Sequence, residues 1–469
     1  MGGIESRFAA YVEKLMGAVG HADRGAPLRA YCRGLLLPGD RKSVEPMAAQ
    51  IAPRRVSAMH QAMHHFVAKA SWSDEAVLNV VRGWTLPALE KAGPILAWIV
   101  DDTGFPKKGK HSVGVARQYC GQLGKQDNCQ VAVTLSVANE GGSLPIGFGL
   151  YLPKEWAEDG ARRSAAGVPE AVVFQTKPQI ALAQIADATA HGVPAGVVLA
   201  DVAYGNDSGF RDGVSALGLA YAVGIQSSVT VWTPGTAPLP AKPWSGRGRP
   251  PTRLRRDEAV HPVSVEALAL SLPRTAFRTV TWRAGAAGKL RSRFAVLQVR
   301  PAHRDEGRSA PRPQGWLLIE WPKGEAKPTK YFLSTLPADI ALKQLVALAK
   351  LRWRIERDYE ELKQELGLGH YEGRSWRGFH HHATLCIAAY GFLVSERSPI
   401  PPSGPAWRPR TPRLPKGWRP RGSPDPARAA QPDFDCHPAP ALECRPRHGA
   451  APMPLLPASQ QHNAPFMTQ

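Results

Sequence analysis

Cysteine is scarce in this sequence, and closely spaced cysteine pairs are missing. The 469 residues include six cysteines, none of them in a Cys-x-x-Cys pair. Disulfide-rich secreted domains and zinc fingers both depend on such spacing, so neither class is indicated. The cysteine content favours a reducing compartment, and we expect a cytoplasmic protein.

Long apolar runs are missing as well. No segment approaches the roughly 20 consecutive apolar residues that a membrane-spanning helix requires. The N-terminus also lacks the apolar stretch of a secretory signal peptide. We therefore expect no membrane partner.

Acidic residues are few compared with basic ones. The chain has 59 Lys and Arg against 39 Asp and Glu, which gives a formal net charge of +20 at pH 7. Residues 398–469 contribute nine basic and four acidic side chains, so the rest of the chain still carries +15. Such a charge favours a polyanionic partner, and nucleic acid is the first candidate.

The N-terminal half shows two patterns of secondary structure. Residues 1–93 have helical periodicity, with Ser73 as an expected N-cap, and predict a small helical domain that binds DNA ends. Residues 94–226 alternate strands and helices. The strand in "ILAWIVDDTGF" stops at two aspartates, a hairpin turns at Glu140-Gly141-Gly142, and the strand in "AGVVLADVAYG" ends at Asp201.

The C-terminal half contains three further segments. Residues 227–335 predict a β-rich insertion, because short apolar segments alternate with turn residues. Residues 336–397 return to a helical pattern that we expect to rejoin the core, and residues 398–469 are so rich in Pro and Arg that we expect disorder. The apolar stripe of the returning helix consists of Leu345, Leu348, Ile355, Tyr359, Leu362 and Leu366.

Carboxylates at strand ends and on a returning helix suggest a metal site. Acidic groups that converge in a basic protein are costly unless a cation lies between them. Mg²⁺ prefers oxygen ligands, and two such ions can clamp the attacking and leaving oxygens of a phosphoryl transfer. Glu356 on the basic helix "LRWRIERDYEELK" is the expected third carboxylate.

Three blocks in this order carry a family resemblance. "WIVDDTGF", "VLADVAYG" and "LRWRIERDYEELK" resemble the acidic blocks of the bacterial insertion-sequence DDE transposases. The resemblance covers about residues 94–397. It implies an α/β fold: a ribonuclease-H-like mixed sheet flanked by helices, interrupted by a β-rich insertion and preceded by the small helical domain.

The resemblance also implies roles for individual residues. It assigns Asp102, Asp201 and Glu356 as catalytic residues that hold two Mg²⁺ ions, with Mn²⁺ able to substitute. Its Tyr-x2-Arg-x3-Glu-x6-Lys signature is matched at Arg352, Glu356 and Lys363, but the Tyr position is occupied by Ala349. Residues four and seven apart share a helical face, so we expect these three side chains to point together, with Arg352 and Lys363 gripping DNA.

The activity implied is that of a DNA transposase. It would cleave strands at the ends of a mobile element and transfer them into target DNA. The implied partners are double-stranded DNA, namely terminal inverted repeats and target, and a second copy of the chain in a synaptic homodimer. Association with the bacterial nucleoid through DNA would follow.

Further side chains are expected to contact DNA. Basic residues after the first strand would neutralise phosphates, although a merely solvated loop is the alternative. "GRGRPP" is similar to an AT-hook or is a basic linker. An aromatic residue further on would stack on a base or cover the sheet edge. These residues are Lys107, Lys108, Lys110, Arg117 and Lys125, then Arg247 and Arg249, then Arg374 and Trp376.

Simpler readings of the carboxylates stay open. The Asp pair could end a strand in a solvated turn, Asp201 could cap the next helix, and Glu356 could pair with a neighbouring Arg. Two other functions also stay open. One is a catalytically inactive DNA-binding derivative or repressor of a mobile element, and the other is a ribonuclease-H-like nuclease that cuts branched DNA.

Overall fold

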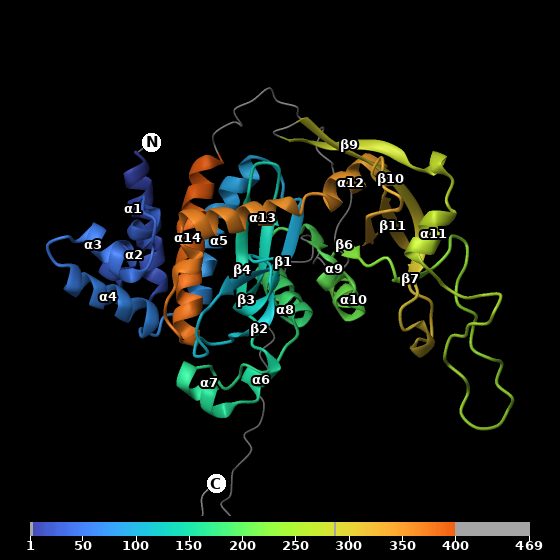
Figure 1. Ribbon diagram of the computed structural model, residues 1–469, viewed down its shortest axis with the longest axis horizontal. Coiled ribbons are helices and arrows are strands. Elements are labelled where there is room, and N and C mark those ends of the chain that lie inside the picture. Colours follow the sequence, from blue (N-terminus) through green and yellow to red (C-terminus); the bar gives the residue numbers. More distant parts are fainter. Residues whose placement is uncertain (1–2, 286–287, 399–469) are drawn as a thin grey trace, which may run out of the picture. The chain divides into compact units, whose positions relative to one another are not determined.

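The structure is a computed structural model that describes residues 3–285 and 288–398 (Figure 1). The expected disordered tail lies outside these residues, apart from Ser398. No described helix is both long and apolar enough to cross a membrane. The cysteines at positions 32, 120, 129 and 386 are buried and free.

The N-terminal region is helical, as its periodicity predicts. Ser73 caps a helix as expected, because its hydroxyl accepts a hydrogen bond from the Ala76 amide at 3.1 Å. The buried residues of these helices join the same apolar cluster as one face of the sheet. The helices are α1 (Ile4–Ala18), α2 (Gly25–Leu36), α3 (Val44–Ile51), α4 (Val56–Ala68) and α5 (Asp74–Lys91).

The central sheet has the predicted ribonuclease-H-like layout. Strand β3 pairs antiparallel with β1 on one side and with β4 on the other, while β1, β5 and β6 run parallel. A short strand, β2, pairs with the beginning of β3. The bounds are β1 Ala97–Pro106, β2 Ala116–Cys120, β3 Lys125–Ala138, β4 Ser143–Leu150, β5 Val197–Ala200 and β6 Tyr221–Ile225.

The insertion is β-rich, as predicted, and it continues the core sheet. Its last strand, β12, pairs antiparallel with β6, and β11 and β10 follow in order. The elements are β7 (Thr230–Trp232), β8 (Val263–Ser264), α11 (Val265–Ser271), β9 (Arg278–Gly285), β10 (Gly288–Pro301), β11 (Gly315–Glu320) and β12 (Lys330–Ser334).

Helices cover both faces of the sheet because side chains alternate along each strand. Trp98 and Val100 of β1 belong to the cluster that includes α8 and α14 residues, whereas Ala97 and Ile99 belong to the cluster that includes α12 residues. The remaining helices are α6 (Lys154–Ala157), α7 (Gly160–Ala166), α8 (Lys177–Ala190), α9 (Val202–Gly205), α10 (Ser208–Ala216), α12 (Leu342–Ala349), α13 (Trp353–Glu360) and α14 (Trp376–Arg397).

The returning helix differs from the sequence-based expectation. It is broken between α12 and α13 at Lys350–Arg352, and α13 passes into a π turn at Glu361–Glu365. The expectation of a continuous helical stripe is therefore wrong at this junction. Consequently Arg352 is the N-cap residue of α13, and Lys363 lies in the π turn instead of on a regular helix with Glu356.

Helix α14 is almost entirely buried. It packs against α5, α2, α4 and β4 and carries three consecutive histidines. His382 lies between the Tyr31 hydroxyl at 2.8 Å and the Gly367 carbonyl at 3.0 Å, and His381 stacks on Trp72. His381 and His382 thus join α14 to the N-terminal helices, whereas His380 accepts a hydrogen bond from the Leu150 amide of β4 at 3.3 Å.

Candidate active site

The first two acidic blocks meet where the middle of β1 lies beside the end of β5. The expectation that the first strand stops at its two aspartates is wrong, because pairing with β3 continues β1 through them to Pro106. Strands β1 and β5 are parallel, with Ala97 opposite Val197 and Ile99 opposite Leu199. Continuing this register by two residues brings Asp101 level with Asp201, the N-cap residue of α9, and Asp201 contributes to the raised pKa of Asp101. Neighbouring strands lie about 4.8 Å apart, so these two carboxylates belong to one site.

Asp101 and Asp102 point to different neighbours because they are successive residues of one strand. Asp101 accepts a 2.5 Å hydrogen bond from Arg352, which precedes α13. Asp102 accepts a 2.7 Å bond from Lys177, the first residue of α8. The side chain of Asp101 is the more buried of the two, with 15% exposed against 27% for Asp102.

Arg352 is the cation that contacts two of the acidic blocks and lies within electrostatic range of the third, at Asp201. Its guanidinium contacts Asp101 at 2.5 Å and Glu356 at 3.3 Å. Burial would lower the pKa of Arg352, but Asp101, Asp201 and Glu356 outweigh burial and raise it. Glu356 itself is accessible, with 63% of its side chain exposed. Arg352 and Glu356 therefore do point together, as expected.

The surroundings of Asp101 disfavour the charged form of its carboxylate. Burial raises its pKa to about 7, the charge of Arg352 opposes this rise, and Asp201 adds to it. A buried carboxylate next to a second one is unfavourable unless a cation compensates for both. Arg352 provides that compensation in this structure.

The buried Tyr204 and the half-buried Tyr359 lie near the carboxylates. Burial raises the pKa of Tyr204, and Asp102, Asp101 and Asp201 all add to the rise. Burial likewise raises the pKa of Tyr359, with contributions from Asp101 and Asp102. Both aspartates of the pair thus lie within electrostatic range of the same phenols.

Asp201 also has a local structural role. Its carboxylate accepts a 2.9 Å hydrogen bond from the Ala203 amide and caps the short helix α9. This contact matches the alternative in which Asp201 only caps a helix, and the pairing of Glu356 with Arg352 matches the alternative in which Glu356 only forms an ion pair. A cap and an ion pair leave other carboxylate lone pairs available, so these contacts do not exclude a second ligand.

The carboxylates suit a hard cation chemically. Asp101, Asp102, Asp201 and Glu356 are all oxygen donors, and three of them already bind protein cations: Asp101 and Glu356 bind Arg352, and Asp102 binds Lys177. In the described part of the chain, the trio whose ligand atoms lie within 4.8 Å of one another is Glu75, Asp187 and His191, and no three of the carboxylates Asp101, Asp102, Asp201 and Glu356 approach one another this closely. Arg82 bonds to two of its members, so that cluster holds a protein cation.

Lys363 and Lys107 are held by backbone carbonyls near the site. Lys363 donates to Gly104 at 2.8 Å, and burial lowers its pKa to about 8. Lys107 donates to Tyr371 at 2.8 Å, and burial lowers its pKa as well.

The other expected DNA contacts lie mostly at the surface. Trp376 is half-buried and packs on the ring of His380, with 4.3 Å between centroids. Lys125 is exposed and pairs with Asp127 at 3.3 Å. The exposed residues of the remaining set are Lys108, Lys110, Arg117, Arg247, Arg249 and Arg374.

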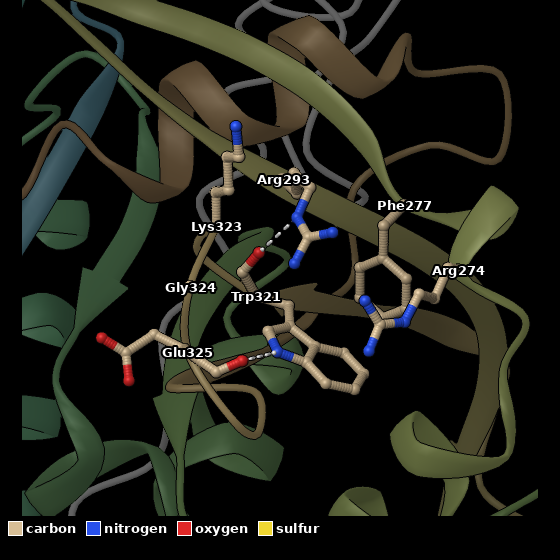
Figure 2. Close-up of a pocket in the computed structure, with 7 residues that line it drawn as sticks. All are labelled: Arg274, Phe277, Arg293, Trp321, Lys323, Gly324 and Glu325. Atoms are coloured by element: carbon tan, nitrogen blue, oxygen red, sulfur yellow. Dashed lines mark hydrogen bonds between the residues drawn. The ribbon is translucent and has the colours of Figure 1, made fainter.

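A basic and aromatic pocket of about 390 Å³ lies on the insertion (Figure 2). Trp321 and Phe277 meet edge to face at 5.2 Å, and Arg293 donates to the Trp321 carbonyl at 3.2 Å. Arg274 and Lys323 are exposed at its rim. Sequence reasoning missed this pocket because its residues come from three separate segments.

Sequence reasoning also missed Lys177 and Asp101 as members of the site. Thr176 and Gln179 form a capping box that marks the start of α8, so the position of Lys177 at a helix start was readable. Its partner was not, because the contact joins residues 75 positions apart.

Two comparisons with known proteins agree on the kind of protein that this chain resembles. A family model described as DDE superfamily endonuclease matches residues 14–289. The chain is also 35% identical over 169 residues to a protein described as "Probable transposase for insertion sequence element IS701" from Microchaete diplosiphon. That match covers 36% of this chain and 41% of the relative.

Proposed function

The chain belongs to the DDE superfamily of endonucleases, and from this membership we propose that it is a DNA transposase. It would cleave DNA strands at the ends of a mobile element and join them to target DNA. The observation that carries the proposal is the position of Arg352, which contacts Asp101 of β1 and Glu356 and lies within electrostatic range of Asp201 after β5.

The carboxylates of the site would hold divalent metal, in this proposal two Mg²⁺ ions with Mn²⁺ as a substitute. Bound ions of this kind supply the Lewis acidity that activates a water or a 3′-hydroxyl and stabilises the leaving oxygen. Asp201 and Glu356 are two of the ligands we propose. The third is one of the two adjacent aspartates.

Two arguments point to different members of that pair. The family pattern assigns Asp102, the residue immediately before Thr103. The strand register, extended by two residues past Ile99 and Leu199, favours Asp101, which also shares Arg352 with Glu356. The proposal therefore includes both positions, and substitution at each one separates them.

Arg352 and Lys177 would have a second role as resident counter-ions. In this structure they neutralise Asp101 and Asp102. When DNA and divalent metal enter, these cations would be released from the carboxylates to contact phosphate oxygens. An Arg fork suits phosphate especially well because it donates in two parallel bonds.

DNA would contact the basic surface around this site. The exposed lysines and arginines after β1, the Arg247–Arg249 segment and Arg374 would bind the DNA backbone. Lys363, whose ammonium bonds to Gly104 of β1, and Trp376 would add further contacts. The helical N-terminal region and the insertion, including the Trp321 pocket, would recognise terminal inverted repeats. Two copies would pair two element ends as a homodimer.

The test is cleavage of DNA that carries the element's ends. Purified protein is incubated with labelled end fragments, with and without Mg²⁺, and both binding and nicking are measured. We expect end-specific nicking that requires Mg²⁺ and disappears in Asp201→Asn and Glu356→Gln, while binding persists. Binding without nicking by the unsubstituted protein would contradict the proposal and support a repressor.

A branched DNA substrate supplies the control for specificity. A junction of unrelated sequence is compared with the element's ends in the same assay. Cleavage that follows junction shape and ignores end sequence would identify a branch-specific nuclease instead.

A further inference from the structure

The break before the Glu356 helix is held by the β insertion. Helix α12 ends at Ala349, three residues form the junction, and α13 begins at Trp353. Arg352, which contacts Asp101 and Glu356, lies inside this junction. Any shift of the junction would therefore move both the guanidinium and the carboxylate of the site.

Lys350 anchors the junction from its N-terminal side. Its ammonium pairs with Glu320 at the end of β11, and the side chains are only 12% and 7% exposed. Trp282, Phe294 and Phe332 surround the ammonium, with centroids at 4.9, 5.6 and 5.9 Å. These aromatic residues come from three different strands of the insertion, so Lys350 is held by the insertion sheet as a unit.

Arg283 anchors the junction from its C-terminal side. Its guanidinium carbon lies 3.8 Å from the centre of the Trp353 ring, within the range of a cation–π contact. Burial lowers the pKa of Arg283, and Glu356 acts against that effect. Arg283 thus touches Trp353, the first residue of α13, and lies within electrostatic range of the Glu356 carboxylate.

An irregularity in β9 makes both anchors possible. Leu290 of β10 is opposite Arg283 and Arg291 is opposite Thr281, so Trp282 has no partner. This is a β-bulge, which re-aims side chains that would otherwise alternate between faces. Consecutive residues, Trp282 and Arg283, can therefore reach the same junction.

The two anchors resist movement because each would be costly to break. Separating Lys350 from Glu320 would leave a buried charge without its partner, which is strongly destabilising. Withdrawing Arg283 would remove its cation–π contact with the Trp353 ring. The junction is thus fixed by the insertion on both sides.

We propose that the insertion positions Glu356, with Arg283 as the positioning residue that acts through Trp353. This inference rests on the proposed function for its effect on cleavage. Its structural part, the clamping of α13 by β9, stands independently. In this view the insertion contributes to assembly of the active site as well as to DNA recognition.

The experiment compares Arg283→Ala and Arg283→Met with Arg278→Ala, an exposed arginine on the same strand. Hydrogen–deuterium exchange of residues 350–360 is measured without DNA. Nicking rates at saturating DNA, DNA dissociation constants and the Mg²⁺ concentration for half-maximal rate are measured separately. Thermal melting establishes that each variant is folded, and Arg283→Met retains the aliphatic stem if Arg283→Ala is unstable.

Both Arg283 variants are expected to exchange faster across residues 350–360 than Arg278→Ala. Their nicking rate should fall by roughly 10- to 100-fold, as expected when a catalytic group is displaced by about 1 Å. DNA affinity should stay within about 2-fold, and the half-maximal Mg²⁺ concentration should rise. Arg283→Lys, which keeps the charge, should recover part of the rate.

Two other outcomes have distinct meanings. Exchange and nicking in both Arg283 variants that match Arg278→Ala would overturn the positioning role. Faster exchange in these variants, together with no nicking by the unsubstituted protein, would leave the clamp intact and overturn the proposed function.

Discussion

At the residue scale, the site depends on which side of a strand a carboxylate occupies. Asp101 and Asp102 are adjacent, yet one bonds to Arg352 and the other to Lys177. Sequence spacing showed two adjacent acids after an apolar run, but it did not show that β1 continues past them to Pro106. It could not show their partners, because the two cations come from helices far away in the chain.

The first prediction separates the two aspartates. If the strand register identifies the ligand, Asp101→Asn should lower the nicking rate by at least about 100-fold, whereas Asp102→Asn should retain most of it. Loss in Asp102→Asn with retention in Asp101→Asn would instead support the family pattern. DNA binding measured without metal is the control. It should be unchanged in both variants, because asparagine preserves the volume of the aspartate side chain.

Buried histidines give a second residue-scale prediction, for stability. Burial lowers the pKa of His382 to about 4, from an ordinary value near 6.5. The unfolded chain therefore binds one more proton than the folded chain between pH 6.5 and 4. Stability attributable to this group is fully present above pH 6.5 and is lost as the pH falls towards 4.

Urea unfolding at several pH values measures this effect. In the unsubstituted protein the free energy of unfolding should fall through this window, with His382 contributing about 1.4 kcal/mol per pH unit at most. In His382→Gln that slope should be reduced by about one proton. An unchanged slope would mean that His382 is already protonated in the folded state.

At the element scale, local patterns predicted the core well. Ser73 capped its helix, the hairpin formed at Glu140–Gly142, and the strand before Asp201 ended where its apolar run ended. Each of these depends on a few neighbouring residues. The attachment of β12 to β6 was not predictable in the same way, because strand pairing joins segments about 100 residues apart.

The break between α12 and α13 shows how tertiary contacts override a local pattern. No Gly or Pro marks the junction, and the apolar repeat continues through it. The contacts of Lys350 and Trp353 with the insertion supply what the sequence lacks. Lys350 is predicted by helical periodicity to continue a helix, yet its ammonium is held by Glu320.

The third prediction tests this buried pair by its effect on stability. Lys350→Met should lower the free energy of unfolding by about 3 kcal/mol, because it leaves Glu320 buried without a partner. The double variant Lys350→Met with Glu320→Gln should lose markedly less, because no uncompensated charge remains. Urea unfolding of both single variants and of the double variant measures the coupling. Additive losses would show that the two side chains act independently.

At the scale of the whole molecule, charge and architecture point to one partner. The sheet runs from the carboxylate site into the insertion without interruption, and the N-terminal helices pack on the same core through α14. The insertion and the N-terminal helices, which we propose recognise DNA, are thus attached to the sheet that carries the aspartates. The net charge of +20 then favours association with DNA over long range, most strongly at low salt.

The final prediction concerns the salt dependence of binding. Lys108 and Lys110 are exposed in the loop after β1, and each would neutralise one DNA phosphate. Removing both in Lys108→Ala with Lys110→Ala should reduce the slope of log affinity against log salt by roughly 2, because each neutralised phosphate contributes about 0.9. Lys154→Ala is the matched control, since Lys154 is exposed but pairs with Glu158 at 3.6 Å. Fluorescence anisotropy from about 50 to 200 mM salt gives the slopes. Equal slopes in the double variant and the control would mean that this loop is merely solvated, and that the charge attracting DNA lies elsewhere on the surface.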